Sequence, residues 1–187
     1  MKLKTQTIII AIVAILAYVK RKAILALFSG KPNWIVIAEA EKGQKEAVGG
    51  KHNARILEYH GATSGKASSD EVAWCSSFVN WVMEKAGKGK TGSALAVSWA
   101  KYGKKLEQPC YGCIAVMSYG NGFGHVGFVV GKKGAKLLFL GGNQSDSVRV
   151  SAFPTTQIIA YVVPSDYNPP ASAYDLQEGD GTTATTR

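Results

Sequence analysis

Apolar side chains change their spacing once along this chain, from a helical period to an extended one. Before residue 103, they recur at three- and four-residue intervals in four segments, near 33–44, 53–60, 75–86 and 94–102, which we predict to be helices. After Gly112, five runs rich in Val, Ile, Phe and Tyr are separated by turn residues, near 113–119, 125–131, 136–140, 147–152 and 157–163. Helices followed by short strands predict an α+β domain with the helices packed on a roughly five-stranded antiparallel sheet.

The first 30 residues differ from the rest because an unbroken apolar run, Ile8 to Val19, lies between basic residues. This run makes about 18 Å of helix, whereas a membrane span needs about 20 residues. No small-x-small cleavage site follows it. We therefore expect residues 1–30 to form an uncleaved N-terminal membrane helix, with Ile8 to Val19 in lipid and the second apolar run, Ala23 to Phe28, at the membrane surface. A signal-like segment and an ordinary buried helix of the domain are the alternatives.

Two boundaries follow from the composition. Ser29-Gly30-Lys31-Pro32 breaks the helical pattern, so we expect the globular domain to span 31–164. Residues 165–187 are rich in Asn, Pro, Ser, Thr, Gly and acidic residues with almost nothing to bury, which predicts a disordered tail.

The net charge of +9 comes from 22 basic and 13 acidic side chains. It suits an anionic surface such as phospholipid headgroups or cell-wall polymers, although solubility alone also explains it. No basic stripe is interleaved with aromatic residues, so we do not expect a nucleic-acid partner.

Cys75 stands in the stretch Asp-Glu-Val-Ala-Trp-Cys-Ser-Ser-Phe-Val-Asn-Trp, residues 70–81. A helix N-terminus stabilises a thiolate, which makes Cys75 a candidate nucleophile if the helix begins there. If the helix begins at Ser69 or Asp70, the thiol falls in the second turn and this effect weakens. Its apolar neighbour Phe78 also fits an inert core cysteine.

His125 follows a glycine-rich loop at the first position of a predicted strand, where it could act as a general base. The partner strand ends in Leu-Gly-Gly-Asn-Gln, residues 140–144, and returns to the same end of the sheet. An amide there could orient the imidazole, with Asn143 as the first choice and Gln144 as the second. The alternatives are a structural histidine and ordinary turn chemistry.

The order Cys75, His125, Asn143 on a helix followed by a sheet resembles the papain-like cysteine hydrolases of the CHAP and NlpC type, which cut peptidoglycan. The shared stretches are Asp-Glu-x-x-Trp-Cys-x-x-Phe-Val-Asn-Trp, Gly-His-Val-Gly-Phe and Leu-Gly-Gly-Asn-Gln, and the resemblance runs from Pro32 to about Pro164. It implies an amidase or endopeptidase that acts through an acyl-enzyme, with these residues as nucleophile, base and orienting group. No metal or other cofactor is implied.

The resemblance also suggests residues around the site. Trp74, Trp99 and Gln144 are expected to contact the substrate, with Trp81 as a further wall or packing residue. By contrast, we expect His52 and His60 to lie on the surface.

One stretch departs from the family, since Pro-Cys-Tyr-Gly-Cys at residues 109–113 replaces an expected Pro-x-x-Gly-Asp. A lone Cys-x-x-Cys lacks the further ligands of a zinc site, and its position before a strand does not suit redox catalysis. Two free thiols or a local disulfide between Cys110 and Cys113 remain.

The sequence thus predicts a membrane-anchored peptidoglycan hydrolase that faces the cell wall, in a bacterial envelope or a membrane-containing phage virion. A non-catalytic wall-binding or structural protein with the same fold is the main alternative. An acyltransferase or transglutaminase-like enzyme using the same three residues is another.

Overall fold

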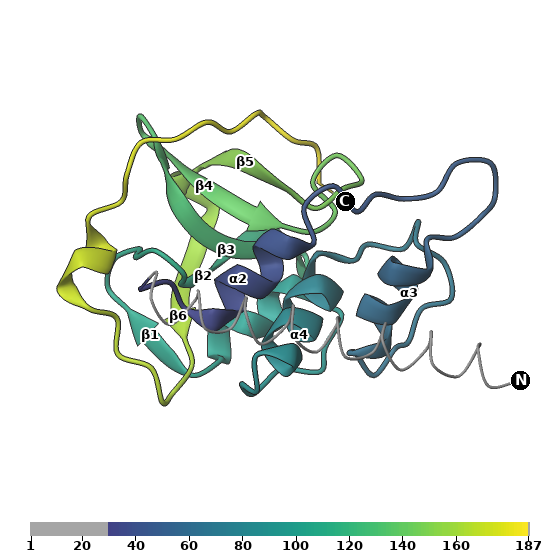
Figure 1. Cartoon of the computed structure of the whole chain (residues 1–187), viewed down its shortest axis with the longest axis horizontal. Helices are drawn as coiled ribbons and strands as arrows, with labels where there is room; N and C mark the ends of the chain where they lie inside the picture. The colour runs from purple at the N-terminus through teal and green to yellow at the C-terminus, as the bar shows by residue number, and fades with distance from the viewer. Residues whose placement is uncertain (1–29, 187) are drawn as a thin grey trace, which may run out of the picture.

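A computed structural model describes residues 30–186 as one antiparallel sheet with helices on one face (Figure 1). The six strands lie in the order β1-β6-β2-β3-β4-β5. Their bounds are β1 Lys104–Leu106, β2 Ile114–Gly120, β3 Phe123–Lys133, β4 Lys136–Gly141, β5 Arg149–Pro154 and β6 Ile158–Val163. The helices are α2 Asn33–Ala40, α3 Ala54–Gly61 and α4 Cys75–Lys85, and the 3-10 turns are η1 Ala96–Lys101, η2 Thr155–Gln157 and η3 Ala171–Tyr174. The predicted α+β class is confirmed.

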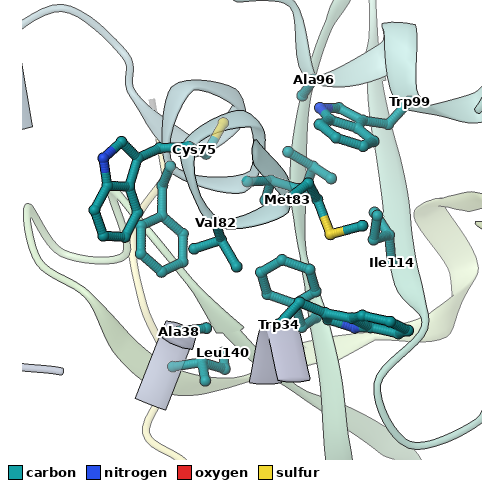
Figure 2. Packing of buried hydrophobic residues seen from close by; sticks show 14 of the residues in the cluster. Trp34, Ala38, Cys75, Val82, Met83, Ala96, Trp99, Ile114 and Leu140 are labelled. Carbon is teal, nitrogen blue, oxygen red and sulfur yellow. The ribbon is translucent and has the colours of Figure 1, made fainter. Parts of the chain in front are cut away.

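The main core lies between the helices and the sheet. Figure 2 shows Val82 and Met83 of α4 beside Trp34 of α2, Ile114 of β2 and Leu140 of β4. Each of these side chains is buried, and full burial of a large apolar side chain contributes about 1.5 to 3 kcal/mol. This packing fixes α4 against the middle of the sheet.

A second core lies on the other face of the sheet and is covered by the C-terminal segment, residues 165–186. Leu176 is buried there with Phe139 and Phe153. The structure therefore differs from the expected disordered tail. Strand groups left open by the sheet bind this segment through its backbone, which requires no apolar pattern. Thus Lys132 N donates to Gln177 O, and Ala152 N donates to Thr182 O.

Several predicted elements change at their edges. The sheet gains β1, whose sequence Lys-Lys-Leu carries no alternation, because Gly103 allows close approach to Val163. The helix expected to reach residue 44 ends at Ala40, and the segment 94–102 forms the 3-10 turn η1. Short polar edge segments lack the period that identifies longer elements.

The membrane helix is predicted for residues 1–30, and all of these except Gly30 lie outside the described residues. Within 30–186, none of the helices combines the length and apolar character needed to cross a membrane.

Candidate active site

The central helix α4 begins at Cys75, which answers the question left open by the sequence. Trp74 is its N-cap residue, with non-helical backbone angles, and its indole Nε1 donates to Glu46 Oε1 at 2.8 Å. The Trp74 ring also lies against Gly142, where an added Cβ would come within 2.5 Å of it. Contacts from two loops therefore hold the start of the helix, and Cys75 occupies its first turn.

The thiol of Cys75 lies against backbone N–H groups. Val126 of β3 donates to it, as do the N–H groups of Ser76 and of Cys75 itself. These donors favour the thiolate, but the residue is only 3% exposed, and burial raises the pKa of the Cys75 thiol to about 11. The structure thus brings the thiol to the residue that follows His125.

His125 is fully buried near the start of β3, with its ring against Phe139 and Phe153 of the second core. Its Nε2 lies 3.1 Å from Gln144 Oε1. Burial lowers the pKa of His125 to about 4, although the bond to Gln144 opposes this shift. Nothing in the described part of the chain bonds to Nδ1, which is also buried.

The amide of Gln144 fixes the tautomer of this histidine. Gln144 Nε2 donates to Phe139 O at 3.2 Å and to Arg149 O at 2.6 Å. Because carbonyl oxygens only accept, the amide nitrogen must face them and Oε1 must face the imidazole. His125 Nε2 therefore carries the hydrogen, and Nδ1 of the neutral ring has a free lone pair.

Asn143, the first choice for the orienting residue, occupies a different position. It is 1% exposed and adopts φ of 54°, a left-handed conformation that Asn tolerates better than most residues. Within residues 30–186, neither Nδ2 nor Oδ1 has a hydrogen-bond partner. The structure therefore pairs His125 with Gln144 and leaves the Asn143 amide unpaired.

The tryptophans expected near the substrate are packing residues in this structure. Trp74 and Trp99 are fully buried, and Trp99 Nε1 donates to Ser76 Oγ at 3.0 Å. Trp81 is also buried, with its indole bonded to Glu58. Side chains in these positions contact a substrate only if they become exposed.

His60 is buried rather than on the surface, so that prediction is wrong. Its Nδ1 lies 3.0 Å from Ser77 Oγ of α4, because α3 packs directly on α4. His52 is exposed, as predicted, and its Nδ1 lies 3.0 Å from Asp70 Oδ1. The buried Asp70 carboxylate also accepts from Ala47 N and Asn53 N, so it ties together the loops that precede α4.

Sequence reasoning missed a rim of exposed apolar side chains around the thiol. Exposed large apolar residues are Val48, Val72, Leu95, Tyr119, Phe123 and Ile159. All except Ile159 stand on segments that border the start of α4 or of β3. Burial raises the pKa of the Tyr119 phenol, the hydrogen bond to Thr186 opposes this shift, and the charge of Cys75 adds to it, as expected for a ring on the Cys75 side of the molecule. In the sequence, the turn Tyr-Gly-Asn-Gly at residues 119–122 was the feature that could have indicated an exposed aromatic side chain here.

Of the two options for Cys110 and Cys113, the structure has two buried free thiols. Cys110 N donates to Cys113 Sγ at 3.4 Å. A hydrogen bond between the two thiols lowers the pKa of Cys110, while burial raises the pKa of Cys113. Across 30–186, no three His, Cys, Asp or Glu residues gather in an arrangement suited to a metal ion.

Comparison with known proteins gives one match. A family model described as the CHAP domain matches residues 67–143, which include Cys75, His125 and Asn143 and end one residue before Gln144. No curated protein and no solved structure matches the chain. The match indicates a hydrolase related to peptidoglycan in general. The resemblance of this chain to the CHAP family is thus confirmed over residues 67–143, which hold both the thiol at the start of α4 and the histidine of β3.

Proposed function

We propose that this protein is a cysteine hydrolase that cleaves peptide or amide bonds of peptidoglycan through an acyl-enzyme. The observation that carries the proposal is the position of the Cys75 thiol. It lies at the first residue of α4, against the N–H of Val126, the residue that follows His125 in β3. The CHAP match over the same residues supports peptidoglycan as the substrate class.

In the proposed reaction, Nδ1 of His125, which has no bond to the thiol in this closed form, takes the thiol proton as Cys75 Sγ attacks the carbonyl carbon. The N–H of Cys75 at the helix start is suited to stabilise the oxyanion, since it already faces the sulfur. Collapse breaks the C–N bond, and the leaving amine takes the proton from His125. Water then attacks the thioester with His125 again as base, which releases a carboxylate and regenerates the thiol.

The electrostatics favour general-base catalysis over a preformed ion pair. Burial raises the pKa of Cys75 to about 11 and lowers that of His125 to about 4, so both are neutral near pH 7 while the site is closed. Proton transfer then accompanies attack on the substrate. A substrate or water that solvates the site would bring the two pKa values closer together.

We propose that Gln144 is the residue that positions His125, in place of Asn143. The support is the hydrogen bond to Nε2 and the backbone carbonyls that hold the Gln144 amide. The unpaired, buried amide of Asn143 is then available to bind a peptide group of the substrate, which offers both a donor and an acceptor.

Zymography on purified peptidoglycan tests the proposal. We expect the wild-type chain to clear the wall and Cys75→Ala to leave it intact, because the variant lacks the nucleophile. Serine is a closer match in size, so Cys75→Ser serves as the control for packing. Equal clearing by wild type and Cys75→Ala, or none by either, contradicts the proposal.

Mass spectrometry of the released muropeptides then identifies the bond. A free amine and a carboxylate in equal amounts indicate hydrolysis, whereas a new crosslink indicates an acyltransferase. If the wild type and Cys75→Ala both bind peptidoglycan and neither releases a product, the non-catalytic wall-binding alternative is indicated. Since the substrate is a wall polymer, we also propose that the domain faces the cell wall.

A further inference from the structure

The reactive groups of this site are closed to solvent. Cys75 is 3% exposed, and His125 and Gln144 are fully buried. A wall polymer cannot bring a peptide bond to the Cys75 sulfur while the site has this form. Some part of the structure must therefore move before a reaction begins, and the C-terminal segment is placed to be that part.

Consecutive residues of this segment bind on two sides of the site. Thr185 O accepts from Ser145 N at 2.8 Å, and Thr185 N donates to Ser145 Oγ at 3.3 Å. The next residue, Thr186, places its Oγ1 2.8 Å from the hydroxyl of Tyr119. Ser145 directly follows Gln144, while Tyr119 is the aromatic residue on the Cys75 side of the molecule.

The strand order determines what lies between these two anchors. Strands β2, β3 and β4 are neighbours in that order. Tyr119 stands at the end of β2, and Ser145 stands just beyond the end of β4. A chain that joins them must cross the start of β3, where His125 lies.

The two parts of this segment are held by different interactions. Its first part is anchored by apolar packing, with Leu176 buried in the second core. Its last part, residues 182–186, contains four threonines and one alanine and is held chiefly by hydrogen bonds, including that of Ala152 N to Thr182 O at 3.0 Å. Because exposed hydrogen bonds contribute little net stability, this part can detach while the first part stays in place.

We propose that residues 182–186 form a strap that lies over the approach to Cys75 in the place of an extended substrate peptide, and that it slows access to the thiol. This inference rests on the proposed function, since it names a regulation of the same site. The backbone of Thr185 forms two hydrogen bonds with Ser145. A peptide substrate would bind there in the same way, by hydrogen bonds to the loop that follows β4. Displacement by substrate, or proteolytic removal of the strap, would open the site.

Alkylation of Cys75 by iodoacetamide, followed by peptide mass spectrometry, tests the strap without any wall substrate. The full chain is compared with a chain that ends at Gly181 and with Thr185→Pro, which removes the N–H that binds Ser145. Thr183→Pro is the matched control, because Thr183 is exposed and both bonds of Thr185 and Thr186 can remain. The shortened chain loses all the hydrogen bonds of residues 182–186, which predicts at least about tenfold faster alkylation. Thr185→Pro loses the one N–H bond, which predicts an increase of about two- to tenfold, with the control unchanged.

The outcomes separate the strap from the proposed function. Faster alkylation and faster wall cleavage by the shortened chain support both the strap and the hydrolase function. Faster alkylation with no wall cleavage by any chain supports the strap and contradicts the hydrolase. Equal alkylation rates overturn the strap, and so does an equal increase in Thr183→Pro. If the shortened chain is not folded by circular dichroism, Thr185→Pro alone decides.

Discussion

At the residue scale, a single amide determines which ring nitrogen of His125 carries the hydrogen. Gln144 donates to two backbone carbonyls and so must accept from the imidazole Nε2. Its neighbour Asn143 is equally buried but has no partner in the described part of the chain. Substitutions at these two positions should therefore have different kinetic effects.

We expect Gln144→Leu to lower kcat on peptidoglycan by about 10²- to 10⁴-fold, because the imidazole loses the group that fixes its tautomer. Asn143→Ala should mainly raise KM, since we assign its amide to substrate binding. Steady-state kinetics on a defined muropeptide measures both. A large fall in kcat for Asn143→Ala, with Gln144→Leu still active, would restore Asn143 as the orienting residue.

The buried His125 also predicts how stability depends on pH. Its pKa is lowered from 6.5 to about 4 in the folded protein, so the unfolded chain binds a proton first as pH falls. Stability is therefore complete above pH 6.5 and is lost as pH falls toward 4, by an amount on the order of 3 kcal/mol. Urea unfolding at several pH values should show a smaller loss in His125→Gln.

His60 limits the size of that difference. Burial lowers its pKa as well, so part of the acid-induced loss should persist in His125→Gln. A variant with the same pH dependence as the wild type would show that His125 is not buried as a neutral ring.

At the element scale, the loop after β4 and the start of α4 fit closely. A Cβ on Gly142 would come within 2.5 to 2.7 Å of the Trp74 ring and of Phe78 Cβ. Trp74 caps the helix that presents Cys75, so this glycine lets the loop and the helix start approach each other. The position of the helix start, and so of Cys75, therefore depends on that contact.

We expect Gly142→Ala to destabilise the fold by about 1 to 3 kcal/mol, because a rigid ring and a helix must shift to admit the methyl group. It should also lower wall cleavage by displacing Cys75. Gly61→Ala is the control, since Gly61 ends α3 with nothing within 4 Å of an added Cβ. Urea titration measures the free energy of unfolding of both variants. Equal stability of Gly142→Ala and Gly61→Ala would contradict the close fit.

At the scale of the whole molecule, the C-terminal segment covers the second core. Removing residues 165–187 should expose the side chains around Leu176 and destabilise the domain by at least about 1.5 to 3 kcal/mol. Removing only 182–187 should change stability much less, since that part contributes mainly exposed hydrogen bonds. Thermal unfolding compares the two deletions, and equal melting temperatures would contradict the covering role.

The sequence by itself determined the features that depend on local pattern. The change from helical to extended spacing predicts the α+β class and the five longer strands. The stretch around Cys75 and the Gly-His strand predict a candidate nucleophile and a candidate base, because each places a reactive side chain near the start of an expected element. The CHAP match covers residues 67–143, which include both side chains.

Only the tertiary structure decided which neighbouring amide meets His125. Asn143 and Gln144 are adjacent in the chain, and the choice depends on a loop in which Asn143, Ser145 and Asp146 have positive φ. That conformation turns the Gln144 side chain toward β3, and sequence spacing does not encode it.

The path of residues 165–186 was likewise decided by tertiary contacts. Its polar composition indicates disorder when it is considered alone, since it has little to bury. The strand edges of β3 and β5 bind its backbone, and backbone hydrogen bonds form with almost any sequence. Local pattern thus predicts the longer elements and the candidate reactive residues, while the partners of buried amides and open strand edges are known only once the chain is folded.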